Sequence, residues 1–295
     1  MKSESMVDTL PAVNGAHSPM QPLTGDTALI SRLQALLGAP VEIVAELGST
    51  NDELVRRALA DSQALALPDM SLLVTDYQNA GKGRLDRTWE VRPGEALTFS
   101  LLLRPVAVPP ETYGWFTMLM SCAVTQALRD HGLAAQTKWP NDVLVGTRKI
   151  TGILAALVVT PGAAPAVVVG TGLNVSTTHL PVETATSVQR EGCNLGRADL
   201  LVDVLEKFLP LYRRFCADPT ELTVPDGRLR TVVESQLGTL GQRVRAELPG
   251  AQAPLTGRAV GLDDHGALLI RPEGGRVRAV SAGDVVHLRP TEERS

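Results

Sequence analysis

The sequence predicts an α+β domain followed by a small all-β domain. From residue 26 to 237, apolar strands are interspersed with amphipathic helices, whereas short strands separated by turns begin at Gly238. The chain has 295 residues, of which 44% are hydrophobic, so it is long enough for about two domains with separate cores. We expect a disordered tail at 1–25, a first domain at 26–237 and a second at 238–290, where the strand spacing suits a small closed barrel.

Composition excludes several classes of protein. A net charge of -4 and a pI near 5.8 give no basic surface for nucleic acid. The most apolar run, 153–170, is interrupted by two prolines and a glycine, so we expect no membrane partner. The five histidines lack metal-ligand spacing. A disulfide-free, cytoplasmic protein is expected, because no C-x-x-C spacing joins the three cysteines, Cys122, Cys193 and Cys216.

The first domain opens with an amphipathic helix around 29–37 and a strand at 41–45. A second helix starts within Gly48-Ser49-Thr50-Asn51-Asp52-Glu53, where either Ser49 with Asp52 or Thr50 with Glu53 has capping-box spacing. This segment is compatible with a plain helix N-cap. It is also compatible with a ligand site, because the amide groups of a helix N-terminus are free to bind.

A loop rich in glycine and cations follows the apolar strand 71–75. Gly81 and Gly83 permit either a positive φ or a close approach of two backbones, so consecutive amides could form an anion nest. Three cations, Lys82, Arg84 and Arg87, would surround it. The loop therefore predicts a phosphate site, and the alternative is a solvated hairpin.

The rest of the first domain alternates between strands and helices. A helix at 111–131 has apolar residues at helical spacing and includes Cys122 as a buried thiol. Gly170-x-Gly172 follows a strand but precedes no helix, which argues against a dinucleotide site. Strands are expected at 97–103, 136–139, 143–145, 149–159 and 166–175, helices at 200–212 and 228–237, and C-terminal strands at 243–247, 255–259, 267–270, 277–280 and 285–288.

Five segments in a fixed order resemble the catalytic domain of biotin protein ligases. They are Gly48–Asn51, the glycine loop 81–89, Lys138-Trp139-Pro140-Asn141-Asp142, the run 148–154 and Gly170–Val175. The family loop is written GRGRxGRxW, from which this sequence departs at Lys82 and Asp86. The resemblance implies a mixed sheet with flanking helices, like that of class II aminoacyl-tRNA synthetases, and an SH3-like C-terminal domain.

The resemblance also implies a set of site residues. Catalytic roles fall to Lys149, Arg84 and Asp142, with Asp142 as a metal-binding or lysine-orienting carboxylate. Biotin would contact Ser49, Thr50, Asn51, Gln78, Gly81, Lys82, Gly83, Arg84, Lys149, Gly152 and Gly172. ATP would contact Lys82, Arg84, Arg87, Trp89, Asn141, Lys149 and Asn174. Trp89 is expected either to stack on adenine or to anchor the loop. Mg²⁺ is the expected cofactor beside ATP and biotin, and no dedicated set of metal ligands is assigned.

The expected activity is ATP-dependent transfer of biotin to a lysine of a carboxylase's biotin carboxyl carrier domain. The segment before Ser49 predicts a single helix, too little for a DNA-binding helix-turn-helix, so we expect a monofunctional ligase. Two alternatives stay open: a lipoate protein ligase, and a biotin-sensing repressor or non-catalytic protein. The expected assembly is a monomer or weak homodimer.

Overall fold

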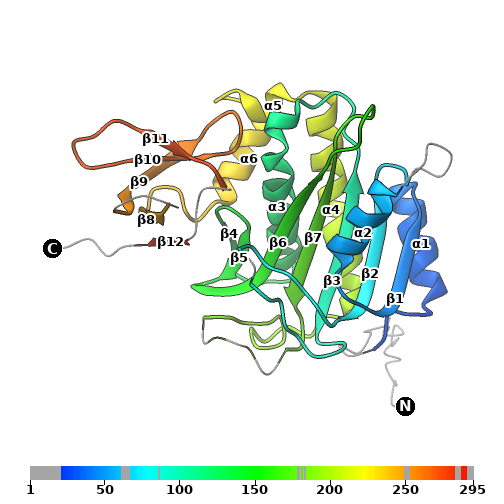
Figure 1. Cartoon of the computed structure of the whole chain (residues 1–295). Coiled ribbons are helices and arrows are strands. Elements are labelled where there is room, and N and C mark those ends of the chain that lie inside the picture. Colours follow the sequence, from blue (N-terminus) through cyan, green and yellow to red (C-terminus); the bar gives the residue numbers. More distant parts are fainter. Residues whose placement is uncertain are drawn as a thin grey trace, which may run out of the picture.

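The computed structural model describes residues 21–60, 67–85, 87–177, 180, 182, 184–248, 253–282 and 287–290. A seven-stranded sheet forms its centre, in the order β1-β2-β3-β7-β6-β5-β4 (Figure 1). The β1–β2 pair is parallel and the other neighbours are antiparallel. Its strands are β1 (Val41–Leu47), β2 (Ser71–Gln78), β3 (Ala96–Leu103), β4 (Ala135–Lys138), β5 (Asp142–Val145), β6 (Arg148–Val158) and β7 (Ala166–Asn174).

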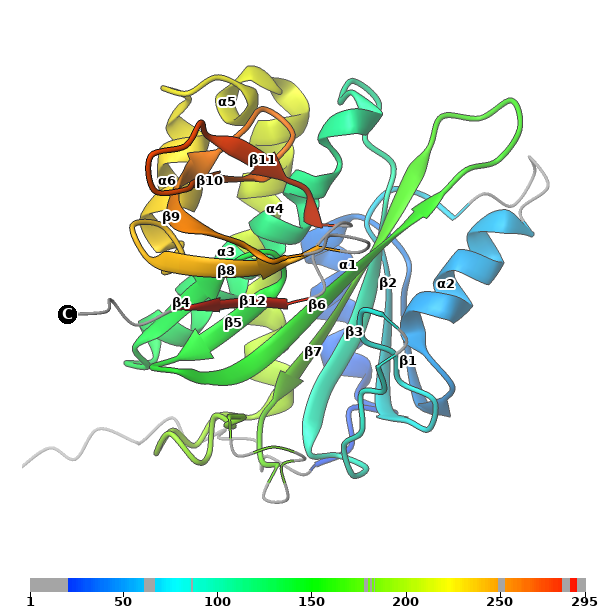
Figure 2. The ribbon, with the colours of Figure 1, turned by 60° about the vertical axis from the view of Figure 1, so that its left-hand side comes forward.

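Helices cover the two faces of this sheet unequally (Figures 1 and 2). Alternate side chains of β3 and β7 pack with α3 and α4 in the main core, together with α1. The intervening side chains, such as Leu102 and Val168, pack against Leu54 and Ala58 of α2 in a second, smaller cluster. The described helices are α1 (Thr27–Leu37), α2 (Thr50–Leu59), η1 (Pro110–Thr112), α3 (Gly114–Asp130), α4 (Arg197–Ala217), α5 (Thr220–Thr223) and α6 (Arg228–Gln236).

The α2 face of the sheet has a hollow beside that helix. Opposed residues on neighbouring strands share a face, and here Gly172 pairs with both Thr98 and Gly152. One step along, Gly170 pairs with Ser100 and Leu154. The glycines contribute no side chains to this face, so the G-x-G of β7 leaves space in the middle of the sheet.

A five-stranded antiparallel sheet forms the C-terminal part, in the order β11-β10-β9-β8-β12. It lies beside the end of the large sheet that carries β4 (Figure 2). Two indole groups hold its turn at 263–266: Trp115 Nε1 donates to the Asp264 carbonyl at 2.9 Å, and Trp139 Nε1 donates to the Gly266 carbonyl at 3.0 Å. The strands are β8 (Arg243–Glu247), β9 (Leu255–Leu262), β10 (Leu268–Arg271), β11 (Arg278–Val280) and β12 (His287–Pro290).

The predicted elements agree with the structure to within a few residues, and the mixed fold class with a small C-terminal β domain is confirmed. Cys122 is fully buried, as predicted, and desolvation raises its pKa to about 12. The short helix α5 was not predicted. The predicted helix at 111–131 divides into η1 and α3, since Tyr113 separates the two.

The tail prediction is wrong for residues 21–25. Leu23 is buried, and its amide donates to the Asp76 carboxylate at 2.9 Å. Arg197, a buried cation of α4, donates to the Gln21 carbonyl at 2.7 Å and pairs with Asp76. These are long-range contacts, which local composition does not reveal. The remainder of the predicted tail, 1–20, lies outside the described residues.

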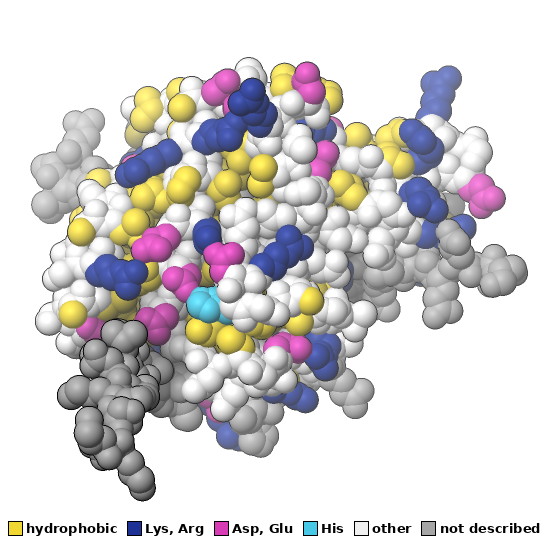
Figure 3. All heavy atoms as spheres, turned by 180° about the vertical axis from the view of Figure 1, so that it is seen from behind, with side chains coloured by type: hydrophobic (Ala, Val, Ile, Leu, Met, Phe, Trp, Pro, Cys, Tyr) yellow, Lys and Arg dark blue, Asp and Glu magenta, His cyan; other side chains and the backbone are white. Residues whose placement is uncertain are grey.

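Acidic and basic side chains are interspersed on the face seen in Figure 3, the reverse of the view in Figure 1. Such mixing gives a field of alternating sign and not a continuous positive stripe. Within the described residues, no helix combines the length and apolar character needed to cross a membrane.

Candidate active site

The N-terminus of α2 faces the hollow of the sheet. Ser49 is its N-cap, and its hydroxyl accepts the Asp52 amide at 3.3 Å, so the first of the two predicted caps is the one that forms. The backbone amide of Thr50 donates to Gln78 Oε1 on β2 at 2.7 Å. Gln78, which was expected to contact biotin, therefore lies directly beside the predicted helix start.

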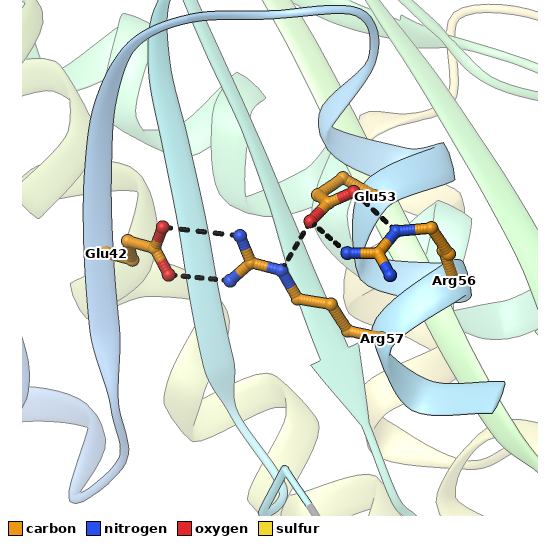
Figure 4. Close-up of polar contacts among 4 residues, drawn as sticks. All are labelled: Glu42, Glu53, Arg56 and Arg57. Atoms are coloured by element: carbon orange, nitrogen blue, oxygen red, sulfur yellow. Dashed lines mark hydrogen bonds and ion pairs between the residues drawn. The ribbon is translucent and has the colours of Figure 1, made fainter. Parts of the chain in front are cut away.

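A network of charged side chains fixes α2 on its outer side (Figure 4). Arg57 contacts Glu42 of β1 at 2.6 Å and Glu53 at 2.7 Å, while Arg56 contacts Glu53 at 2.7 Å. Hydrogen bonds from Arg56 and Arg57 lower the pKa of Glu53 from 4.5 to about 2. The network ties the helix that carries Ser49 and Thr50 to the edge strand.

The glycine loop is a tight hairpin. The Trp89 amide donates to the Gly81 carbonyl at 2.9 Å, and the Gly83 amide donates to the Arg87 carbonyl at 2.7 Å. A Cβ on Gly81 would lie 2.4 Å from the Trp89 carbonyl oxygen, which explains the glycine by close backbone approach.

Of the two geometries left open for these glycines, a positive φ or a close backbone approach, the hairpin shows the second. Neither Gly81 nor Gly83 has a positive φ, whereas Leu85 does, at 55°. The Gly83 amide is already used within the hairpin, so it is not available to an anion nest. Asp86, one of the two departures from the family loop, lies outside the described residues.

Two of the hairpin's cations, Lys82 and Arg84, are directed to different partners. Lys82 pairs with Asp52 at the start of α2, with 2.6 Å between Nζ and Oδ2. Arg84 donates to the carbonyl of Ala282 in the C-terminal domain. Burial lowers the pKa of Arg84, an effect that Asp142 opposes and Arg87 reinforces. The hairpin thus connects α2 with the C-terminal domain across the hollow.

Lys149 and Asp142 face the hairpin from β6 and β5. Their Nζ and Oδ1 atoms are 2.6 Å apart, so Asp142 orients the ammonium, one of the two roles predicted for it. The Lys149 backbone amide is also fixed, by the Thr184 carbonyl at 2.7 Å. Asn141 donates its side-chain amide to the Ile153 carbonyl at 2.8 Å, which ties the turn before β5 to β6.

The indole of Trp89 lies in the space that the paired glycines leave. A Cβ on Gly172 would be 2.6 Å from the ring, and one on Gly152 would be 3.5 Å from it. The indole nitrogen is buried and has no hydrogen-bond partner among the described residues. Trp89 therefore anchors the loop here, one of its two predicted roles, and its N–H remains available to a ligand.

These groups enclose a cavity of about 220 Å³. Most of the predicted residues line it: Ser49, Thr50, Asn51, Gln78, Lys82, Gly83, Arg84, Arg87, Trp89, Asn141, Asp142, Lys149, Gly152 and Gly172. Residues to which sequence reasoning gave no role line it too: Leu85, Thr88, Thr98, Lys138, Trp139, Pro140, Ile153, Leu154, Gly170 and Thr171.

Two predicted residues do not line the cavity. Gly81 packs against the Trp89 backbone, so it shapes the loop. Asn174 is buried at the end of β7 and donates to the Thr186 carbonyl at 2.9 Å, which fixes the segment after that strand. Of the residues missed, Gly170 could have been found from strand alternation, because it lies two positions from Gly172 on the same face of β7.

The fold and the cavity define an enzyme site for an anionic substrate, because cations from separate elements converge beside polar groups of α2. Residues 48–174 match the biotin/lipoate A/B protein ligase family, and residues 239–288 match the biotin protein ligase C-terminal domain. The chain belongs to the biotin protein ligase family, as the sequence motifs indicated, and it is a ligase.

Individual relatives agree with this assignment. The biotin–[acetyl-CoA-carboxylase] ligase of Mycobacterium tuberculosis is 37% identical over 84% of this chain and 89% of its own length. The bifunctional ligase/repressor BirA of Bacillus subtilis is 31% identical over 73% of this chain and 66% of its own length. The Aquifex aeolicus biotin protein ligase in complex with biotin and ATP has a TM-score of 0.69 and 26% identity, covering 85% of this chain and 99% of that one.

Proposed function

We propose that this protein activates biotin with ATP as biotinyl-5′-adenylate and transfers the biotinyl group to a lysine of a biotin carboxyl carrier domain. The carrier would be that of acetyl-CoA carboxylase or a related carboxylase. The observation that carries the proposal is the single cavity in which Lys149, the hairpin cations and the polar start of α2 meet. The name of the M. tuberculosis relative and the ligands of the A. aeolicus structure support it.

The first step brings two anions together. A carboxylate oxygen of biotin attacks the α-phosphorus of ATP, the bond from that phosphorus to the bridging oxygen breaks, and pyrophosphate leaves. Repulsion between the carboxylate and the phosphate is lowest where a cation is fixed in advance. Asp142 holds the Lys149 ammonium at 2.6 Å, so Lys149 can stabilise the negative charge that both anions share in the transition state.

Arg84, Arg87 and Lys82 supply further positive charge from the opposite wall. The Lys82–Asp52 pair is solvent-exposed, and such pairs contribute little stability, so phosphate can displace Asp52 from Lys82 at small cost. Arginine side chains suit this task because their planar donors can bind two phosphate oxygens at once.

Magnesium fits this site as a companion of ATP and not as a resident ion. The described residues contain no group of three metal-binding side chains, and Asp142 is the one carboxylate among the cavity-lining residues. Mg²⁺ commonly takes most of its ligands from phosphates and water. When bound, it would neutralise charge on the departing pyrophosphate, with Asp142 as this chain's candidate ligand.

The second step needs a neutral amine and a dry acyl group. The carrier lysine nitrogen attacks the biotinyl carbonyl carbon, a C–N bond forms, the bond to the phosphate oxygen breaks, and AMP leaves as the amine loses a proton. Water attacking the same carbon would hydrolyse the adenylate to free biotin and AMP. Trp89 lies against the glycines of the cavity floor and the rest of the hairpin lines the cavity, a position suited to excluding water.

The structure favours biotin over lipoate at the α2 end. Thr50 and Gln78 present hydrogen-bonding groups side by side, which match the N–H and C=O of a ureido ring. The dithiolane ring of lipoate has neither group. Against that ring, the groups of Thr50 and Gln78 that face the ligand would lack a ligand partner, at a cost of roughly 1–3 kcal/mol each.

Exchange of labelled pyrophosphate into ATP tests the activation step without a carrier protein. We expect exchange that requires both biotin and Mg²⁺. Exchange supported by lipoate in preference to biotin would instead favour the lipoate ligase alternative. Biotin binding with no exchange would favour a non-catalytic biotin sensor.

A further inference from the structure

The side-chain amide of Asn51 has a fixed orientation. Its nitrogen side lies 2.8 Å from the backbone carbonyl oxygen of Leu154, which can only accept a hydrogen bond. Nδ2 must therefore face Leu154, and Oδ1 faces the other way. Asn51 is buried, so Oδ1 needs a hydrogen-bond donor.

Ser100 of β3 is that donor. It is fully buried, and its Oγ lies 2.6 Å from Asn51 Oδ1 and 2.7 Å from Thr50 Oγ1. A hydroxyl has one proton, and an amide oxygen can only accept, so the Ser100 proton belongs to Asn51. The contact between Ser100 and Thr50 can then be a hydrogen bond only if Thr50 donates.

This order of donation determines where the Thr50 hydroxyl directs its proton. Thr50 has a second oxygen neighbour, Gln78 Oε1, at the longer distance of 3.1 Å. Placing its proton there would leave two hydroxyl oxygens facing each other at 2.7 Å with no proton between them. When the Thr50 hydroxyl donates its proton to Ser100 Oγ, a lone pair of Thr50 Oγ1 remains as an acceptor at the cavity wall.

The neighbouring Gln78 has the complementary character. Its Oε1 accepts the Thr50 backbone amide at 2.7 Å, so its Nε2 is the end that can donate to a ligand. An acceptor at Thr50 and a donor at Gln78 together match the adjacent N–H and C=O of a urea. A donor at Thr50 and an acceptor at Gln78 would instead suit a ligand whose C=O faces Thr50 and whose N–H faces Gln78.

We propose that Ser100 is a positioning residue that sets the Thr50 hydroxyl as a hydrogen-bond acceptor and thereby makes this end of the cavity selective for a ligand N–H. The inference rests on the proposed function, in which the N–H belongs to the ureido ring of biotin. Ser100 is not among the cavity-lining residues and acts through Thr50 and Asn51.

Gly170 provides the space that this arrangement needs. It pairs with Ser100 across β3 and β7, on the same face of the sheet. A Cβ at Gly170 would lie 2.1 Å from Asn51 Oδ1, so any side chain there would displace the Asn51 amide. Gly170 therefore leaves the space for the Asn51 amide, and Ser100 donates to that amide.

Calorimetric titration of biotin into Ser100→Ala tests the inference. We expect the dissociation constant for biotin to rise roughly tenfold, the scale for a buried hydrogen-bond network that loses one member. Ser121→Ala is the matched control, because Ser121 is equally buried but donates to Thr117 within α3. Its affinity for biotin should be unchanged. Ser100→Cys, with a weak S–H donor in place of the hydroxyl, should lose affinity as Ser100→Ala does.

Two biotin analogues, each with one ureido N–H replaced by a ring oxygen, separate positioning from general damage. For the analogue that lacks the N–H facing Thr50, Ser100→Ala should change affinity by about threefold or less. Equal losses for biotin and both analogues would overturn the inference, as would unchanged biotin affinity in Ser100→Ala. Failure of the unaltered protein to bind biotin would overturn the proposed function and the inference with it.

Discussion

Lys149 is the residue on which the chemistry of activation most depends. Its ammonium is fixed by Asp142 before any substrate binds, which is the condition for electrostatic stabilisation without reorganisation. For Lys149→Ala we expect biotin-dependent pyrophosphate exchange to fall on the order of a hundredfold or more. Arg148→Ala is the neighbouring control, since Arg148 pairs with Glu191 outside the cavity. Equal rates of pyrophosphate exchange in the two variants would show that Lys149 has no catalytic role.

Substitution of Gly172 should affect both biotin binding and thermal stability. A methyl group there would lie 2.6 Å from the Trp89 ring, so Gly172→Ala must displace the indole from the cavity floor. Overpacking of this kind costs about 1–3 kcal/mol, and we expect weaker biotin binding and a lower melting temperature. Gly261→Ala should be tolerated, because the nearest atom to its Cβ would be 3.9 Å away. Thermal melts and biotin titrations of both variants would show the difference.

At the scale of an element, α2 depends on ionised Glu53. The folded-state pKa of Glu53 is about 2, below its ordinary 4.5, so its contribution to stability is full above pH 4.5 and is lost as the pH falls toward 2. Urea unfolding from pH 2 to 7 should show wild type more stable than Glu53→Gln at neutral pH, with the difference shrinking below pH 4.5. Glu206→Gln, in an exposed pair with Arg32, should show little difference at any pH.

Elements were easier to predict than their contacts. The apolar run of β7 and the apolar spacing of α3 are local patterns, and both elements were predicted within a few residues. The register that pairs Gly170 with Ser100 depends on two strands about seventy positions apart, so local sequence could not supply it. For the same reason Ser100 was missed, although Thr50 and Asn51 were identified from the family motif.

The glycine loop shows the limit of arguing from residue type. Two glycines are compatible with a nest or with close backbone approach, and only the hydrogen bonds between Gly81, Gly83 and their partners distinguish the two. Asn174 shows the same limit, since its side chain bonds Thr186 and not the cavity. A motif identifies residues near a site more securely than it assigns their contacts.

For the whole molecule, Arg84 connects the hairpin to the C-terminal domain through the Ala282 carbonyl. Arg84→Gly removes that contact and a phosphate donor and also loosens the backbone, so closure over the adenylate should weaken while Lys149 continues to support activation. The adenylate should then escape and label lysines of unrelated proteins. Mixing the variant with biotin, ATP and an albumin-like protein should biotinylate the bystander, whereas Arg148→Gly should not. An unlabelled bystander despite continued adenylate synthesis would show that Arg84 does not retain the intermediate.

The central claim is transfer of biotin to a carrier lysine, and one measurement tests it directly. The protein is incubated with biotin, MgATP and a biotin carboxyl carrier domain, and the intact mass of the carrier is then recorded. We predict a mass increase of one biotinyl group, absent without ATP and absent when the acceptor lysine is replaced by arginine. An unmodified carrier, or one that gains lipoate in preference to biotin when both are supplied, would contradict the account.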